Sequence, residues 1–241
     1  MSRFEVDVYD AVIVGGSFTG LATAAALAGN CDRRMKICVL DPRNYEDLVD
    51  QSFNGRATAL SASSKSFLDA LGLWRELEHK IQPITNIDIT DSSLDVVLRP
   101  VFLQFESMLS EDSPAAYMIE NHHLHNALSA RVSVDPNIDF LARNRVVGME
   151  TGEHANTVIT DSGEKISGRL LIAADGRKST LRRLAGIKST SWSYKQFGIV
   201  TTIRHEKSHR GCAVQHFLPA GPFAILPLTG DRCSLVWTEE L

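Results

Sequence analysis

The chain has 241 residues, a formal net charge of −4 and 44% hydrophobic residues, enough for one large or two small globular domains. Its lysines and arginines form no run, which gives no reason to expect nucleic acid as a partner, and no run reaches the roughly 20 apolar residues of a membrane span. The four cysteines show no C-x-x-C spacing, which favours reduced thiols and a cytoplasmic location.

The N-terminal segment predicts a strand, a glycine-rich turn and a helix. Residues 11–14 form an apolar run typical of a buried parallel strand, and the alanine-rich residues 21–27 are typical of a helix packed closely on a sheet. Between them, Gly15, Ser17 and Gly20 occupy the fingerprint positions of a dinucleotide-binding turn. Ser17 stands where the ideal pattern has glycine, at the point where the backbone approaches a pyrophosphate.

An acidic residue follows at the spacing that this motif requires. A second strand is expected at residues 36–40, and Asp41 comes 21 residues after Gly20. An acid at this place accepts hydrogen bonds from a ribose hydroxyl. We therefore expect an adenine dinucleotide to bind Gly15, Gly16, Ser17, Gly20 and Asp41, with an unrelated turn before a helix as the alternative.

The remaining elements alternate between α/β and all-β patterns. The apolar strands, helix caps and turn residues predict an α/β fold in which a Rossmann-like domain with a parallel sheet is interleaved with an antiparallel domain. In chain order we expect a helix after the cap Ser61, strands within 84–98 around a turn at 91–93, a polar loop at 107–114, a strand at 117–119, a helix capped by Asn121, strands at 138–141, 145–149, 157–160 and 169–174, a helix at 179–185, and strands at 197–203, 212–218, 223–228 and 233–238.

Several segments resemble one family. VIVGGSFTGLATAAALA, GRATALS and LLIAADGRKSTLRRLAGI, together with the closing FAILPLTGDRCSLVWTE, resemble flavoprotein aromatic hydroxylases with the p-hydroxybenzoate hydroxylase fold, most closely their ubiquinone-biosynthesis branch. The resemblance runs from about residue 10 to the end. On this basis we expect an FAD-binding domain from residues 1–83 and 117–190, and a substrate domain from residues 84–116 and 191–241.

The resemblance also implies roles for residues outside the glycine-rich turn. Arg56 matches an arginine that reaches the FAD pyrophosphate, and a planar guanidinium suits bidentate phosphate contact; the alternative is a surface arginine. Asp175 and Gly176 match an Asp-Gly motif that holds the cofactor; the alternative is an ordinary turn. Asn121 aligns with a residue that contacts the ribityl or phosphate region, or it is only a helix cap. Relatives often carry arginines at the positions of His122 and His125, so any phosphate attraction there would depend on histidine protonation.

By resemblance, the function is that of an FAD-dependent monooxygenase. NAD(P)H would serve as co-substrate, and one oxygen atom of O2 would pass to a phenolic ring that carries a polyprenyl tail. Because the chemistry belongs to the cofactor, we assign no catalytic side chain. A lipophilic substrate implies peripheral contact with the inner membrane, and contacts with a biosynthetic complex or a second copy are compatible with the family. The alternatives are a flavoprotein acting on another substrate, an NAD(P)-dependent Rossmann dehydrogenase and a non-catalytic FAD-binding fragment.

One family motif is missing from the sequence. Relatives carry a later G-D-A-A-H motif that covers the flavin, whereas the only Gly-Asp after the Asp-Gly motif is Gly230-Asp231, in a pattern typical of a hairpin turn. We therefore expect either the N-terminal portion of a longer protein or a truncated product, and weak or absent FAD binding by these residues alone.

A second motif points to different chemistry. His205-Glu206-Lys207-Ser208-His209 spells H-E-x-x-H, which on a helix would bring two imidazoles to a zinc ion. The segment lies between two strand patterns and lacks the apolar residues of a buried helix. We therefore expect a solvated hairpin loop without a metal, and a zinc peptidase as a distant alternative.

Overall fold

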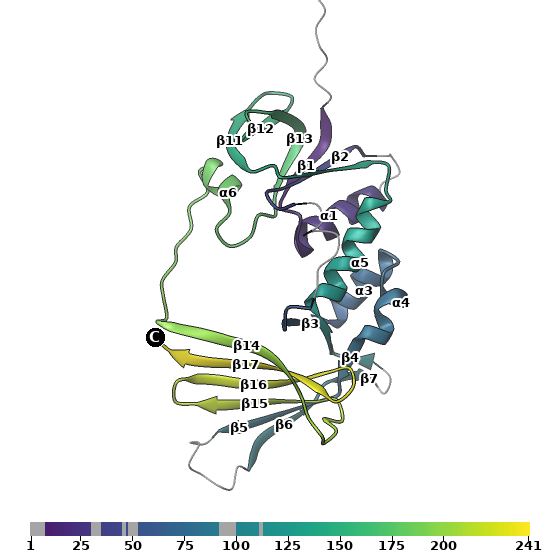
Figure 1. Cartoon of the computed structure of the whole chain (residues 1–241), viewed down its shortest axis with the longest axis vertical. Coiled ribbons are helices and arrows are strands. Elements are labelled where there is room, and N and C mark those ends of the chain that lie inside the picture. Colours follow the sequence, from purple (N-terminus) through teal and green to yellow (C-terminus); the bar gives the residue numbers. More distant parts are fainter. Residues whose placement is uncertain (1–7, 30–34, 45–46, 48–52, 92–99, 111–112) are drawn as a thin grey trace, which may run out of the picture. The chain divides into compact units, whose positions relative to one another are not determined.

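The computed structural model describes residues 8–29, 35–44, 47, 53–91, 100–110 and 113–241, and the chain divides into two compact units (Figure 1). Unit 1 contains Met1–Gln51 and His125–Thr190, and unit 2 contains Ser52–Leu124 and Ser191–Leu241. Cys31, residues 92–93 of the expected turn and the strand pattern at 96–98 lie outside the described residues.

The boundaries of the units differ from the expected domain boundaries. Residues 53–83 and 117–124 were expected with the dinucleotide-binding part, but they cluster with unit 2. The reason lies in strand pairing, because both segments contribute to one small sheet of unit 2. Helix α5 (Asn121–Ser133) begins in unit 2 and ends in unit 1.

Unit 1 is built on a six-stranded sheet. The strand order is β10-β2-β1-β13-β12-β11; the first four strands are parallel, and β12 and β11 continue the sheet antiparallel. This confirms the parallel sheet expected near residues 11–14, 36–40 and 170–174. The elements are β1 (Tyr9–Val14), α1 (Phe18–Gly29), β2 (Ile37–Asp41), β10 (Ile138–Ala142), β11 (Val146–Thr151), β12 (Asn156–Thr160), β13 (Lys165–Ala173) and α6 (Thr180–Leu184).

The core of unit 1 follows from its continuous apolar strands. Val12 and Leu40, on neighbouring strands, are completely buried and pack with Val158 and Leu181 in one cluster. Central parallel strands have both faces covered and therefore need apolar residues without polar alternation. Burial of these side chains fixes the carboxyl ends of β1 and β2 beside one another.

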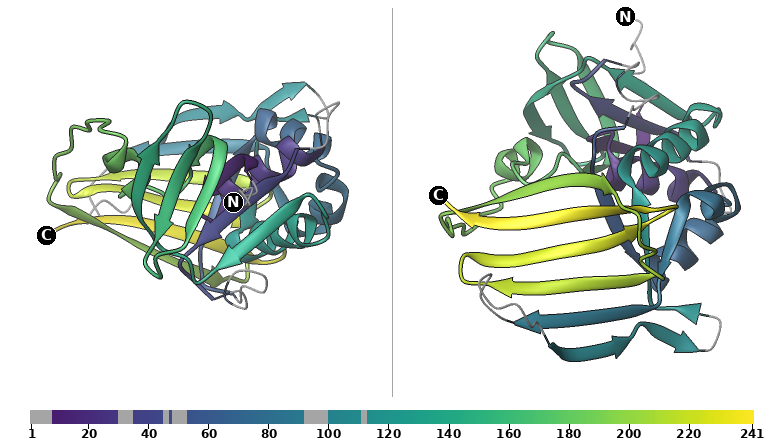
Figure 2. Two further views of the ribbon diagram at one scale, coloured as in Figure 1. Left: turned by 90° about the horizontal axis from the view of Figure 1, so that it is seen from above. Right: turned by 60° about the horizontal axis from the view of Figure 1, so that its bottom comes forward.

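Unit 2 contains a second six-stranded sheet, whose strands lie side by side in the right view of Figure 2. The expectation of an all-antiparallel sheet needs one correction, since β15 pairs with β5 in parallel. Residues 86–91 and β15 are more than 100 residues apart in the sequence, so no hairpin connects these two paired strands. The strand order is β14 (Gln196–Arg204), β17 (Arg232–Glu240), β16 (Gly221–Leu228), β15 (Cys212–Leu218), β5 (Asn86–Asp91) and β6 (Val101–Glu106).

Unit 2 also contains a three-stranded sheet of order β3-β9-β4, a two-stranded sheet and three short helical segments. Ser61 caps the first helix as expected, since its hydroxyl accepts a hydrogen bond from the Ser64 N–H at 3.2 Å. The residues expected as a polar loop at 107–114 include a two-stranded ladder of β7 with β8. The elements are β3 (Ala57–Ser61), α3 (Ala62–Ala70), α4 (Trp74–Leu77), the 3₁₀ helix η1 (Glu78–Lys80), β4 (Ile81–Ile84), β7 (Met108–Ser110), β8 (Ser113–Pro114) and β9 (Ala116–Glu120).

Across the described part of the chain, no helix has the length and apolarity that crossing a bilayer requires.

Candidate functional site

The glycine-rich turn of unit 1 has the close backbone approaches that its sequence predicts. Gly15 has a φ of +112°, and a Cβ there would lie 2.3 Å from the carbonyl oxygen of Ala174. A Cβ on Gly20 would lie 1.8 Å from the carbonyl oxygen of Gly15. Only glycine fits either position, so the turn and the first turn of α1 lie directly against the end of β13.

Ser17 sits at the entrance of α1. Its carbonyl oxygen accepts a hydrogen bond from the Leu21 N–H at 2.9 Å, and the residue lines a cleft at the end of the sheet. A serine before the first helical residue is typical of an N-cap. Ser17 therefore stands both at the start of α1 and at the edge of this cleft.

Asp41 lies at the carboxyl end of β2 and is 4% exposed. Oδ2 accepts hydrogen bonds from the Gly16 N–H at 2.7 Å and from Nη2 of Arg43 at 3.0 Å. Oδ1 accepts from the backbone N–H of Arg43 at 3.0 Å and from its Nε at 2.9 Å. A carboxylate offers about four acceptor sites, so a ribose hydroxyl would have to replace one of these donors.

The same contacts set the acidity of Asp41. Burial alone would raise its pKa, but hydrogen bonds from the side chain and backbone of Arg43 and from the Gly16 N–H outweigh burial and lower it. Asp41 is therefore ionised at neutral pH. Sequence reasoning missed Arg43, although its place two residues after the expected acid was a usable signal.

The turn, Asp41 and the end of β13 border one cleft of about 400 Å³. The cleft contains three cationic side chains together with the backbone of the turn, which is the donor set that a pyrophosphate needs. Sequence reasoning did not single out these cations, because they are separated along the chain and meet only through the strand order. They are Arg43, Arg145 and Lys178.

Asp175 and Gly176 also line this cleft, but the carboxylate of Asp175 is engaged within the chain. It accepts hydrogen bonds from the Ser179 hydroxyl, from the Thr180 N–H at 2.6 Å and from the Leu181 N–H at 3.2 Å. The carboxylate thus caps the start of α6. Gly176 has a φ of +82°, as the expected sharp turn after the strand requires.

His125, in contrast, does not provide a positive charge. The side chain is 1% exposed, its Nδ1 lies 3.2 Å from the Ser129 hydroxyl, and its ring meets Phe18 edge-on. Burial lowers the pKa of His125. At neutral pH, the His125 side chain is therefore not expected to attract a phosphate through a positive charge.

Arg56 and Asn121 lie together in unit 2. The Asn121 N–H donates to the Arg56 carbonyl at 2.9 Å, and its side-chain Oδ1 accepts from the Thr58 hydroxyl at 2.7 Å. Helix α5 starts at Asn121 itself, so this side chain ties the helix to β3 instead of acting only as a cap. The guanidinium of Arg56 is exposed and has no hydrogen bond or ion pair with the described residues.

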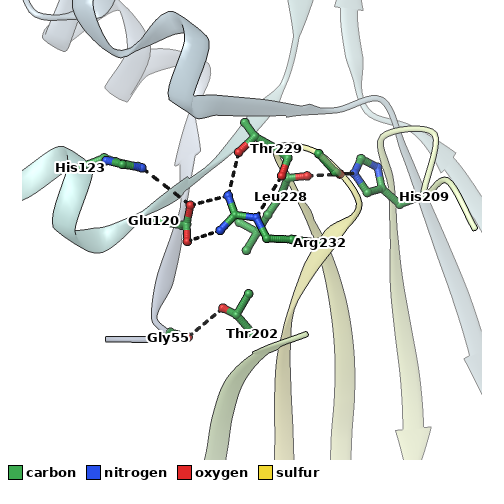
Figure 3. Close-up of polar contacts among 9 residues, drawn as sticks. Gly55, Glu120, His123, Thr202, His209, Leu228, Thr229 and Arg232 are labelled. Atoms are coloured by element: carbon green, nitrogen blue, oxygen red, sulfur yellow. Dashed lines mark hydrogen bonds and ion pairs between the residues drawn. The ribbon is translucent and has the colours of Figure 1, made fainter. Parts of the chain in front are cut away.

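The loop before Arg56 is held by the large sheet of unit 2, as Figure 3 shows. The Thr202 hydroxyl donates to the Gly55 carbonyl at 3.2 Å. At the end of β9, Arg232 donates two hydrogen bonds to Glu120, which directly precedes Asn121. The residue that precedes each of these two candidate residues is therefore held by a side chain of the large sheet.

The H-E-x-x-H segment lies in a loop between β14 and β15 (Figure 3). It is not the expected hairpin, since β14 pairs with β17 and β15 with β16. The Gly211 N–H donates to Nδ1 of His209, so Nε2 carries the proton and donates to the carbonyls of Leu228 and Gly230 at 2.9 and 3.0 Å. Both nitrogens of His209 hold the loop in place, and the helix that a zinc peptidase needs is replaced by a loop.

A family model described as an FAD binding domain matches residues 8–237. The chain belongs to this FAD-binding family. Ubiquinone hydroxylase UbiL of Rhodospirillum rubrum is 39% identical over 233 residues, which cover 97% of this chain and 52% of that protein. The mitochondrial ubiquinone biosynthesis monooxygenase COQ6 of Xenopus tropicalis is 28% identical over 247 residues, covering 97% of this chain and 52% of the relative.

Solved structures support the fold of this FAD-binding family member. The p-nitrophenol 4-monooxygenase PnpA of Pseudomonas putida has a TM-score of 0.79 at 18% identity, covering 97% of this chain and 58% of that one. PqsL of Pseudomonas aeruginosa, crystallised with 2-aminobenzoylacetate, also has a TM-score of 0.79 at 18% identity, covering 97% and 61%. The fold and the relationship to ubiquinone-biosynthesis hydroxylases expected from the sequence are confirmed, and the chain spans about half the length of the curated relatives it matches.

Proposed function

We propose that the chain carries the cofactor-binding and substrate-binding parts of an FAD-dependent monooxygenase that hydroxylates a polyprenyl-phenol ring with NAD(P)H and O2. Two relatives support this proposal, since they are named as a ubiquinone hydroxylase and a ubiquinone biosynthesis monooxygenase. Unit 1 would bind the adenosine diphosphate half of FAD, and unit 2 would hold the aromatic substrate.

The cleft at the carboxyl ends of β1, β2 and β13 carries the proposal. In open parallel sheets, dinucleotides bind at this edge, where a helix N-terminus meets the pyrophosphate. The cleft offers backbone donors from the glycine-rich turn, cationic side chains and the carboxylate of Asp41. These groups fit an adenosine diphosphate moiety in charge and in hydrogen-bonding chemistry.

Each group has a separate task in this proposal. The backbone of Gly15, Gly16 and Ser17 would face the pyrophosphate, with Arg145 and Lys178 balancing its charge. Gly20 would keep the helix close enough to the strand for this contact. Asp41 would accept a hydrogen bond from a ribose hydroxyl after one of its hydrogen bonds from Arg43 breaks.

The remaining candidate residues would also help to hold the cofactor. Asp175 and Gly176 would hold the turn after β13 through the cap of α6. The guanidinium of Arg56 has no partner among the described residues and suits a phosphate, and the amide of Asn121 is oriented by Thr58. Bound FAD supplies the electron transfer and the activation of O2, and the chain's residues bind, orient and exclude water.

We infer that the substrate also brings the protein to a lipid surface. A polyprenyl tail partitions into a bilayer, so the enzyme would meet its substrate at the inner membrane by peripheral contact from the cytoplasm. Contacts with a biosynthetic complex or with a second copy remain part of this proposal.

Competitive binding of FAD, ADP and NAD(P) tests the cofactor assignment. In a chain extended to the length of its relatives, FAD should bind, ADP should displace it from the cleft, and Lys178→Ala should weaken the binding of both ligands severalfold because one cation beside the pyrophosphate is lost. Lys188→Ala, an exposed lysine of unit 1 outside the cleft lining, should change neither affinity. Tight NAD(P) binding without any binding of FAD would support the dehydrogenase alternative.

A further inference from the structure

One face of the large sheet in unit 2 carries a second cavity, of about 360 Å³. Its walls contain two aromatic rings and three aliphatic side chains, and its polar residues are Thr90 and His216. Ligand pockets are typically apolar with a few placed polar groups that orient the ligand. The apolar wall residues are Val214, Leu218, Phe223, Ile225 and Trp237.

Four of the side chains that line the cavity form one row across four strands. In the strand register, Thr90 on β5 is the partner of His216 on β15, His216 that of Phe223 on β16, and Phe223 that of Trp237 on β17. The rings of Phe223 and Trp237 meet edge to face with centroids 5.8 Å apart. Neighbouring paired strands therefore fix the positions of the aromatic rings and of His216 relative to one another.

His216 has one satisfied and one unsatisfied ring nitrogen. The side chain is 5% exposed, and Nδ1 shares a hydrogen bond with the Thr90 hydroxyl. Nε2 is buried and has no hydrogen-bond partner among the described residues. A buried polar atom without a partner costs free energy, and such atoms are rare in native proteins. A ligand group in the cavity would supply the missing partner.

We propose that this cavity binds the ring of a phenolic ligand and that His216 Nε2 hydrogen-bonds its hydroxyl group. This inference rests on the proposed function and names the residue that selects its substrate. If Thr90 donates to Nδ1, Nε2 carries the proton, and if Thr90 accepts, Nε2 is an acceptor. A phenolic hydroxyl both donates and accepts, so it matches His216 in either tautomer.

The composition of the walls narrows the ligand class further. Among the residues that the structure describes, no lysine, arginine, aspartate or glutamate lines the cavity. An anionic ligand such as a benzoate would therefore lose its hydration without gaining an ion pair from these residues. The rings of Phe223 and Trp237, which both line the cavity, suit a flat aromatic ligand. A neutral phenol with apolar substituents satisfies both conditions.

The test compares 4-propylphenol with propylbenzene, which lacks only the hydroxyl, by NMR titration of the 241-residue chain. The phenol should bind about 2- to 10-fold more tightly, the value of one net hydrogen bond. His216→Phe should abolish this preference while the affinity for propylbenzene changes little, and His216→Gln should restore part of it. His79→Phe, an exposed histidine in the same unit, should keep the full preference.

A measurement on the unmodified chain keeps the proposal testable if a variant unfolds. With ¹⁵N-labelled histidine, 4-propylphenol should shift the Nε2 resonance of His216, and propylbenzene should not. Equal affinities for the two probes, or a phenol preference that survives His216→Phe, would overturn the proposal. None of these measurements involves FAD, so loss of FAD binding with an intact phenol preference would contradict the proposed function alone.

Discussion

Arg232 and Glu120 form a bidentate ion pair that joins the start of β17 to the end of β9 (Figure 3). Nη1 donates to Oε1 at 2.9 Å and Nη2 to Oε2 at 2.8 Å, and the Glu120 side chain is only 3% exposed. Parallel hydrogen bonds of this kind need the planar guanidinium fork, which lysine lacks. The pair therefore places the residue that precedes Asn121.

Arg232→Met should lower the free energy of unfolding by about 3 kcal/mol, because it leaves the buried carboxylate of Glu120 with only the ring of His123, 3.8 Å away. The free energy of unfolding of Arg232→Lys should lie between those of the wild type and Arg232→Met. Urea unfolding followed by circular dichroism measures both. The exposed pair Lys165–Glu150, at 2.9 Å, supplies the control, and Lys165→Ala should cost less than about 1 kcal/mol. Equal effects of Arg232→Met and Lys165→Ala would contradict this account.

The pH dependence of unfolding should report the lowered pKa of Asp41. Because its pKa is lower in the folded than in the unfolded chain, its contribution to stability is complete above the unfolded value of about 4 and is lost as the pH falls through the folded value. Asp41→Asn should therefore be destabilising at pH 7, and the difference from the wild type should shrink below about pH 4.

Urea unfolding of Asp41→Asn and of the wild type at several pH values measures this difference. Asp69→Asn, at an exposed position of α3, serves as the control and should follow the wild type throughout. A stability difference for Asp41→Asn that does not change with pH would show that the carboxylate is not held as described.

Gly20→Ala should disrupt the dinucleotide cleft. The new methyl group would overlap the Gly15 carbonyl, so we expect a loss of about 1–3 kcal/mol in stability together with loss of ADP binding. Gly198→Ala is the matched control, because a Cβ there meets no atom within 4 Å and its φ is not positive. Calorimetric titration with ADP measures the affinity of both variants. Unimpaired ADP binding by Gly20→Ala would argue against the tight turn.

Protein purified without a chelator should contain no stoichiometric zinc at the H-E-x-x-H segment. His209→Ala should leave the metal content unchanged and lower the free energy of unfolding by about 1 kcal/mol, since hydrogen bonds to Leu228 and Gly230 are lost. Elemental analysis of both proteins checks this. Zinc that is present in the wild type and absent from His209→Ala would support the peptidase alternative.

The sequence predicted what local patterns determine. The apolar run of β1, the glycines at 15 and 20 and the cap Ser61 each specify a conformation through their own neighbours, and the structure contains all three. The strands after Trp192 were predicted for the same reason, because alternating patterns between turn residues are visible in a single segment.

What the sequence did not predict depends on pairing between distant segments. The parallel pairing of β5 with β15 and the gathering of Arg145 and Lys178 at one cleft both require the strand order of the folded chain. Likewise, no local signal shows that Nε2 of His216 lacks a partner. Such features arise from tertiary context, which composition and periodicity do not contain.

Retention of FAD by Arg56→Ala tests the central claim most directly. In a chain extended to the length of its relatives and reconstituted with FAD, the variant should bind the flavin about 10- to 150-fold more weakly, on the order of 1.5–3 kcal/mol for one charge-assisted contact to phosphate. Arg75→Ala, at an exposed position of α4, should bind FAD like the wild type. An extended chain that shows no flavin absorbance after reconstitution, binds NAD(P) tightly and is indifferent to Arg56→Ala would contradict the assignment as a flavin monooxygenase.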